Sequence, residues 1–214
     1  MATGGATGDA KDSRGETPRS GLEAIILAAG KGSRFGGGKL LAPWGGGALL
    51  HGALAAAFAA PVRSVSLVWG ADSNVAKAAR AWAEAQGEAG RLRLIHAADF
   101  ALGLSASLRA GVDSLPPDAA GAYVFLGDMP RVPHEALIPL AKALAAGAPA
   151  AAPWFGGRRG HPVLFGSDQF PALRALTGDR GAGDLLKALG DAVAKVPAPD
   201  DGVLFDVDQP ADLI

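Results

Sequence analysis

An apolar run that ends in a glycine-rich, basic loop is the feature that most constrains this chain. Residues 24–29 (Ala-Ile-Ile-Leu-Ala-Ala) predict a buried strand. The loop that follows, residues 30–39, holds five glycines, two lysines and one arginine, and no Asp or Glu occurs between Glu23 and Asp72 to neutralise it. Glycines allow successive backbone N–H groups to converge on one anion, so the loop is predicted to bind polyphosphate. A glycine-rich turn with solvated charges is the alternative interpretation.

Two standard phosphate-binding motifs do not fit this loop. A P-loop needs glycine five residues before Gly-Lys-Ser/Thr, but Ser33 stands at that position and Leu40 follows Lys39. A dinucleotide fingerprint needs a third glycine where Phe35 stands, and an acidic residue about 20 residues later to bind the ribose. That acid is absent, so the kinase and dehydrogenase versions of the loop are disfavoured.

Predicted strands and helices alternate along the rest of the chain. Strands are expected over residues 64–69, 91–96, 123–126, 150–155, 162–165, 192–196 and 203–205, and helices over residues 48–60, 72–86, 105–115, 133–146 and 185–189. This order predicts an α/β fold, a three-layer α/β/α sandwich with a mostly parallel sheet and an antiparallel strand added by a glycine-rich hairpin. Residues 21–214 are expected to form a single domain, and residues 1–20 a disordered N-terminal tail.

Composition excludes several classes of function. The net charge of the 214-residue chain is −1, which gives no reason to expect nucleic acid or an anionic membrane as a partner. No run approaches the ~18 apolar residues of a membrane helix, and the N-terminus lacks the apolar centre of a signal peptide. The absence of cysteine excludes disulfides and thiolate chemistry and fits a cytoplasmic protein.

Two groups of carboxylates are candidate metal ligands. Asp128 follows the predicted strand over residues 123–126, and the carboxyl ends of parallel strands meet at one edge of a sheet, so it should lie near the basic loop. Asp206 and Asp208 alternate near the C-terminus and would face the same side of a strand. Carboxylate oxygens together with substrate phosphates are typical Mg²⁺ ligands. The alternatives are a turn aspartate for Asp128 and a helix cap for Asp208.

Histidine and serine residues offer weaker signals. No pair of histidines has the spacing of a zinc site. His161 follows Arg158-Arg159-Gly160, where it could contact an anionic acceptor or simply lie at a solvated hairpin tip. Ser105 and Ser107 precede a predicted helix, so one of them could cap it, or their hydroxyls could bind a base or a phosphate.

The loop sequence resembles the signature of MobA-like nucleotidyltransferases, the group that includes molybdenum cofactor cytidylyltransferase. The matching pattern is Leu27-Ala28-Ala29-Gly30-x-Gly32-x-Arg34-x-Gly36, with Lys39 close behind. Further segments match in order at residues 103–108, 127–130, 160–165, 178–182 and 206–212. Leu104 stands where the family usually has methionine, and Gly183 where many cytidylyltransferases have arginine. The family fold is a Rossmann-like three-layer sandwich with a mixed sheet.

The resemblance implies a role for each matched residue. Contacts with the base and ribose would come from Ala28, Ala29, Gly30 and Ser107. The triphosphate would be held by Gly32, Ser33, Arg34 and Lys39, with Arg34 and Lys39 acting in catalysis. Asp128 and Asp208 would hold Mg²⁺, and His161 would lie on the acceptor side.

The activity that the resemblance implies is transfer of CMP from CTP to a phosphorylated acceptor, with release of pyrophosphate. Leu-Ala-Ala-Gly at residues 27–30 is similar to pyrimidine-nucleotide sites, and the implied acceptor is molybdopterin. Transient contact with a molybdoenzyme or its chaperone is a further implication. The alternatives are a sugar- or alcohol-phosphate acceptor, a nicotinamide-dependent oxidoreductase, and a nucleotide-binding module without catalysis.

Overall fold

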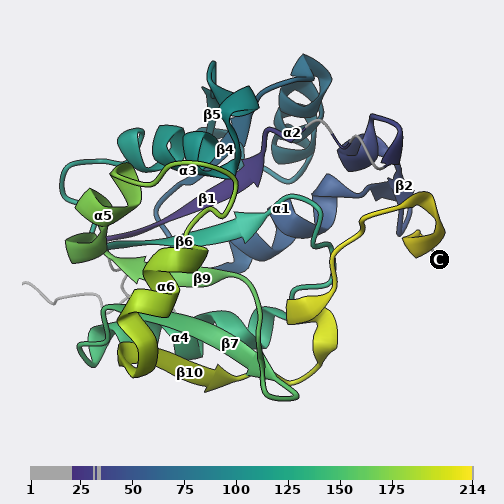
Figure 1. The fold of residues 1–214 in the computed structure, drawn as a ribbon. Helices are drawn as coiled ribbons and strands as arrows, with labels where there is room; N and C mark the ends of the chain where they lie inside the picture. The colour runs from purple at the N-terminus through teal and green to yellow at the C-terminus, as the bar shows by residue number, and fades with distance from the viewer. Residues whose placement is uncertain (1–20, 31, 33–34, 214) are drawn as a thin grey trace, which may run out of the picture.

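The computed structural model of the chain describes residues 21–30, 32 and 35–213 (Figure 1). The predicted disordered tail over residues 1–20 lies outside the described residues, as do Lys31, Ser33 and Arg34 of the basic loop. The described residues form one large sheet covered by helices on both faces (Figure 1). No helix in this part of the chain is long and apolar enough to cross a membrane.

The central sheet is mixed and mostly parallel. Its main strands are β1 (Leu22–Ala28), β4 (Val65–Trp69), β5 (Leu92–His96), β6 (Gly121–Leu126), β7 (Ala150–Phe155), β9 (Val163–Gly166) and β10 (Val193–Pro197). Their spatial order is β10-β7-β9-β6-β1-β4-β5, and the short β8 (Arg158–Arg159) pairs with β7. β9 is antiparallel to both of its neighbours and β8 to β7, whereas the other pairs are parallel. The predicted α/β class and the antiparallel addition are confirmed.

The helices divide between the two faces because strand side chains alternate in direction. α1 (Leu50–Ala59), α2 (Ser73–Ala85) and α4 (Leu137–Ala145) cover one face, and α3 (Leu104–Asp113), α5 (Phe170–Arg174) and α6 (Gly183–Leu189) cover the other. In β1, Ala24 and Ile26 pack with the first group, while Ile25 and Leu27 pack with the second. This two-sided burial explains why the strand is apolar at nearly every position.

One local prediction was wrong, and two elements were not predicted. Residues 203–205, expected to be a strand, belong mostly to the 3₁₀ helix η8 (Asp201–Leu204), which begins where the Asp200 side chain accepts a hydrogen bond from the Gly202 N–H. The short helix α5 was not predicted. Nor was the hairpin of β2 (Pro43–Trp44) and β3 (Gly47–Ala48), whose turn glycines Gly45 and Gly46 both have positive φ angles. Such a Gly-Gly pair is a known hairpin signal.

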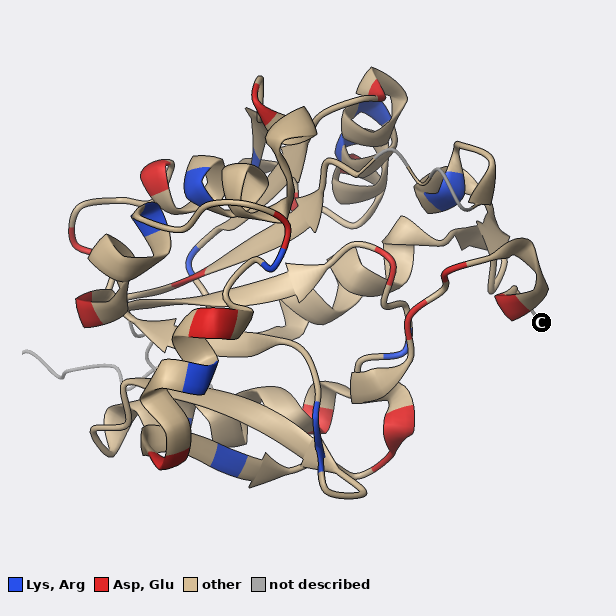
Figure 2. Cartoon of the chain, in the orientation of Figure 1, with Lys and Arg blue, Asp and Glu red and all other residues tan. Residues whose placement is uncertain are grey.

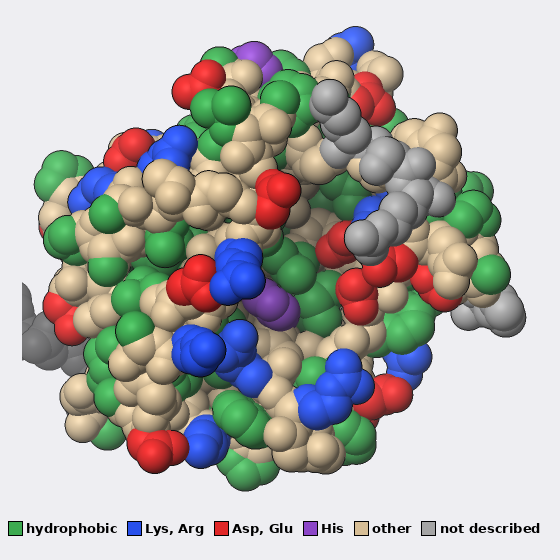
Figure 3. All heavy atoms as spheres, viewed as in Figure 1, with side chains coloured by type: hydrophobic (Ala, Val, Ile, Leu, Met, Phe, Trp, Pro, Cys, Tyr) green, Lys and Arg blue, Asp and Glu red, His purple; other side chains and the backbone are tan. Residues whose placement is uncertain are grey.

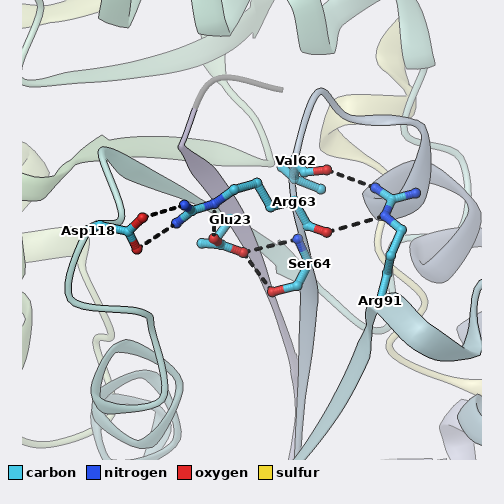
Figure 4. A network of polar contacts seen from close by, with 6 residues as sticks. All are labelled: Glu23, Val62, Arg63, Ser64, Arg91 and Asp118. Atoms are coloured by element: carbon cyan, nitrogen blue, oxygen red, sulfur yellow. Dashed lines mark hydrogen bonds and ion pairs between the residues drawn. The ribbon is translucent and has the colours of Figure 1, made fainter. Parts of the chain in front are cut away.

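A polar network anchors the amino-terminal ends of the strands (Figure 4). Glu23 of β1 is 1% exposed and accepts hydrogen bonds from Arg63 and from the amide and hydroxyl of Ser64. Arg63 also donates two hydrogen bonds to Asp118, and these contacts raise the pKa of Arg63 and lower that of Asp118. The network fixes β1 against the segments that lead into β4 and β6, at the edge of the sheet opposite the basic loop.

Candidate functional site

The site lies at the carboxyl ends of β1 and β6, where the order of the strands reverses. The chain moves from β1 to β4 and β5 on one side, and then returns to place β6 on the other side of β1. Leu27 of β1 is paired with Leu126 of β6, so both strands end at the same edge. Such a switch point leaves a crevice in which open α/β sheets bind ligands.

The glycine-rich loop after β1 runs along this crevice. Gly32 has a φ of 57°, and its carbonyl accepts hydrogen bonds from the amides of Phe35 and Gly37. A side chain on Gly32 would also crowd Lys39, because its Cβ would lie 3.2 Å from that of Lys39. The loop ends in the 3₁₀ helix η2 (Lys39–Leu41), which carries Lys39 toward the sheet edge.

Lys39 forms a polar cluster with two carboxylates that are distant in the sequence. Its ammonium nitrogen lies 2.6 Å from Oδ2 of Asp128 and 3.9 Å from Oδ1 of Asp208. The side chains of Lys39 and Asp128 are 13% and 25% exposed, whereas that of Asp208 is 53% exposed. The sequence suggested that no nearby acid neutralises the loop; this was wrong for Lys39, because the fold supplies acids from 89 residues and more away.

The C-terminal segment brings Asp206 and Asp208 to the cluster without forming a strand. Val207 between them is fully buried, and its amide donates a hydrogen bond to the backbone carbonyl of Asp128 at 3.1 Å. Asp208 is not a helix cap, since Gln209 takes that position for η9 (Pro210–Asp212). Partial burial and the nearby charges of Asp208 and Asp128 raise the pKa of the Asp206 carboxyl.

A cleft of about 620 Å³ opens beside the cluster. Its lining includes Ala28, Ala29, Gly30, Gly32, Lys39, Ser107 and Asp128, so seven of the predicted site residues share one cavity. Ser107 lies on α3, which begins at Leu104 with Gly103 as its N-cap, and therefore neither Ser105 nor Ser107 caps the helix. A side chain at Gly103 would overlap Asp179, a lining residue that the sequence analysis did not single out.

A second, smaller cavity of about 140 Å³ adjoins the cleft and contains His161. Leu27, Leu104 and Leu126 line both cavities, while Arg159 and Arg180 line only the smaller one. His161 comes from the turn between β8 and β9, and its amide donates to the carbonyl of Val203 at 2.9 Å. It thus lies outside the cleft that holds the seven predicted residues named above.

Burial favours the neutral form of the His161 ring. Its Nδ1 atom is buried and has no hydrogen-bond partner among the described residues. Burial lowers the pKa of His161, and the positive charge of Arg159 acts in the same direction, against a backbone hydrogen bond with Val124 and the charge of Asp128. A neutral imidazole with one unsatisfied nitrogen is suited to contacting a polar group of a ligand.

Charged side chains of both signs surround the site. Figure 2 shows acidic residues on the loop after β6 and on the C-terminal segment, near the basic residue of η2. In the space-filling view the face is hollowed at its centre, with acidic side chains gathered on one side and basic side chains on another (Figure 3). In the part of the chain that the structure describes, no three His, Asp or Glu side chains form a group that could hold a metal ion by themselves. A cation held by the carboxylates at this site would therefore need ligands from solvent or substrate.

Comparisons with known proteins agree with this geometry. The family model of the MobA-like NTP transferase domain matches residues 24–193. The purine catabolism protein PucB of Bacillus subtilis (strain 168) is 33% identical over 200 residues, which cover 88% of this chain and 92% of PucB. Both matches include the glycine-rich loop and the residues around Asp128.

Solved structures show the same fold. A homologue of Mycobacterium tuberculosis Rv0371c from Mycobacterium sp. strain JC1 is 28% identical to this chain, with a TM-score of 0.76. The match covers 91% of this chain and 93% of the homologue. Rv0371c of M. tuberculosis H37Rv is 26% identical with a TM-score of 0.74, covering 89% and 95%. Another structure of Rv0371c is a complex with manganese. The extent of the family match and the identity with PucB show that this chain belongs to the MobA-like NTP transferase family, whose members have nucleotidyltransferase-like function.

Proposed function

We propose that the protein transfers CMP from CTP to the phosphate of a small-molecule acceptor, with Mg²⁺ as cofactor and pyrophosphate as the leaving group. The observation that carries this proposal is the contact of Lys39 with both Asp128 and Asp208 at the edge of the larger cleft. A cation beside two carboxylates, next to a glycine-rich loop, suits a site for a nucleoside triphosphate and its metal ion.

The donor set at this edge fits Mg²⁺. Mg²⁺ is usually bound by one or two carboxylates and completes its octahedron with water and substrate phosphates. Asp128 and Asp208 supply two hard oxygen ligands that already contact one ammonium group. The manganese complex of Rv0371c supports a divalent ion in this family. When bound, Mg²⁺ would supply charge neutralisation on the phosphates.

The basic residues would align and stabilise the reacting phosphates. An acceptor phosphate is already ionised near neutral pH, so it needs no general base to attack the α-phosphorus of CTP. The new P–O bond forms as the bond to the β-phosphate breaks, and pyrophosphate leaves with the electron pair. Lys39 would stabilise the developing charge from η2. Arg34, which lies outside the described residues, is proposed to act with it.

The walls of the larger cleft would select the nucleotide. Ala28 ends β1 and Ala29 follows it, and both of these buried residues line the cleft together with the buried Ser107 of α3. Small side chains permit the base to approach the backbone closely, and one hydroxyl can donate to or accept from a base edge. Together with the resemblance of residues 27–30 to pyrimidine sites, this supports CTP over GTP and ATP.

The smaller cavity supports an acceptor that carries a ring. Its volume of about 140 Å³ is close to that of a cavity of ~150 Å³ that holds one benzene molecule. Most of its lining is apolar, so the hydroxyls of a sugar phosphate would be left without partners there. Arg159 and Arg180 would attract an anionic group, and His161 offers one polar contact. The cavity could therefore take one ring of an acceptor together with its anionic group. The choice of molybdopterin over a sugar or alcohol phosphate rests on the family resemblance.

A screen of pyrophosphate release tests the proposal. The four NTPs are each incubated with Mg²⁺ and with molybdopterin, a sugar phosphate or an alcohol phosphate. We expect release with CTP and molybdopterin, and chelation of Mg²⁺ should abolish it. Preference for GTP would refute the pyrimidine assignment, and a sugar phosphate as best acceptor would refute the ring assignment. Binding of NADH without binding of any NTP would identify an oxidoreductase instead.

Two sets of variants test the proposed roles. Arg34→Ala should lose about 2–4 kcal/mol of transition-state stabilisation, as expected for removing one preorganised donor, while the protein stays folded. Asp208→Asn should damage turnover more than Asp206→Asn, because only Asp208 is in contact with Lys39. The reverse order would show that Asp206 is the second ligand.

A further inference from the structure

An aromatic ring lies in the C-terminal segment three residues before Asp208 of the polar cluster. The ring of Phe205 lies 5.7 Å from that of Trp44, measured between centroids, and the two planes are tilted by 38°. The guanidinium carbon of Arg131 lies 4.7 Å from the centroid of the same ring. Arg131 also donates to Asp201 at 3.1 Å, at the start of η8. We name Trp44, Phe205 and Arg131 the aromatic stack.

Each member of the aromatic stack is a near neighbour in sequence of one member of the cluster. Trp44 is in the hairpin that follows η2, five residues after Lys39. The other two pairs are each three residues apart: Arg131 follows Asp128, and Phe205 precedes Asp208. The stack therefore joins the same three chain segments that the cluster joins.

The segment that carries Asp208 has no strand of its own, so its place depends on contacts with other segments, among them the hydrogen bond from the Val207 amide to the Asp128 carbonyl and the aromatic stack. On its downstream side, the Asp212 carboxylate accepts hydrogen bonds from the amides of Asp208 and Gln209, both at 2.9 Å. On its upstream side, the fully buried Val203 and Val207 flank Phe205. Asp208 is thus held between a local cap on one side and the aromatic stack on the other.

We infer that Phe205 is a positioning residue, whose ring in the aromatic stack sets the place of the Asp208 carboxylate relative to Asp128 and Lys39. The inference rests on the proposed metal site for its catalytic meaning, but the geometry that it explains is a property of the chain itself. A leucine at position 205 would keep an apolar side chain and lose the flat face that meets Trp44 and Arg131. Asp208 would then sample more positions, and two-carboxylate binding of a cation would weaken.

The decisive measurement is the affinity of the nucleotide-free protein for Mn²⁺, monitored by electron paramagnetic resonance. Phe205→Leu should weaken Mn²⁺ binding by about three- to tenfold and raise the Mg²⁺ concentration for half-maximal pyrophosphate release by a similar factor. Phe205→Tyr retains the ring and should restore both values. The matched control is Phe155→Leu, which changes a phenylalanine at the end of β7 that is 37% exposed and should change neither.

The outcomes separate this inference from the proposed function. Wild-type protein that binds Mn²⁺ but transfers no nucleotide would refute the proposed function and leave the positioning role to be judged from binding alone. Equal Mn²⁺ affinity of wild type and Phe205→Leu would overturn the positioning role, as would a wild type that binds no Mn²⁺. If Phe205→Leu does not fold, Trp44→Leu decides by the same binding measurement, since it removes the other ring from the stack.

Discussion

Replacing Lys39 with methionine should strengthen metal binding to the free protein while it damages catalysis. In the structure the Lys39 ammonium contacts the two carboxylates that we propose as Mg²⁺ ligands. A metal ion that uses both carboxylates must displace this ammonium or share them with it. Methionine retains the length of the side chain and removes the competing charge.

The size of the effect follows from the two contacts. The Lys39–Asp128 contact at 2.6 Å is partly buried, and a charge-assisted hydrogen bond of this kind contributes about 1.5–3 kcal/mol. The contact with Asp208 is longer and half exposed, so solvent screening limits it to about 0–1 kcal/mol. Removing both should favour Mg²⁺ by about 1.5–4 kcal/mol, or roughly 10- to 700-fold in affinity, at 1.4 kcal/mol for each tenfold change.

Isothermal titration of nucleotide-free protein with Mg²⁺ measures this directly. The control is Lys77→Met on α2, where the lysine contacts only the side-chain oxygen of Asn74 among the described residues. We expect tighter binding in Lys39→Met, unchanged binding in Lys77→Met, and a large loss of turnover in Lys39→Met alone. Unchanged or weaker Mg²⁺ binding in Lys39→Met would refute the competition and with it the two-carboxylate site.

Three further predictions concern the cluster, the anchor of the sheet and the histidine. Asp128→Asn and Asp208→Asn should each lower Mg²⁺-dependent turnover, and the double variant should be little worse than the worse single one, because the pair acts as a unit; losses that multiply would indicate separate roles. Glu23→Ala should lower the free energy of unfolding in urea by about 3 kcal/mol, since it leaves Arg63 without its buried partner, and a loss below about 1 kcal/mol would show that the network is dispensable. Burial lowers the pKa of His161, so the unfolded chain takes up its proton first and stability should fall as the pH drops below about 6.5. His161→Gln should reduce that fall in a series of melting temperatures, and an identical pH dependence would mean that the histidine is solvated.

Elements with strong periodic or apolar patterns could be predicted from the sequence. The strand expected over residues 24–29 is β1, which begins two residues earlier and ends one residue earlier, and its run of buried positions left few alternatives to a strand. The run over residues 203–205 was misassigned because three apolar residues fit a strand and a 3₁₀ turn equally well. Local hydrogen bonding from Asp200 decided between them.

Contacts between distant segments could not be predicted from the sequence. The edge-of-sheet argument brought Asp128 to the loop, but no local pattern indicates that Lys39 contacts it directly. The aromatic stack was likewise invisible, because Trp44 and Phe205 lie in segments without clear periodicity. Asp179 lines the cleft because the backbones of Gly103 and Gly178 pack closely together. This packing is visible only in the folded chain.

The wall between the two cavities has a consequence for how such an enzyme can diversify. Three leucines line both cavities, and they therefore shape the proposed binding sites of both substrates: Leu27, Leu104 and Leu126. A substitution in this shared wall changes the shape of both cavities, so it is expected to alter the fit of both proposed substrates at once. Leu104, at the first turn of α3 and 39% exposed, is the member of this wall with the most freedom to change.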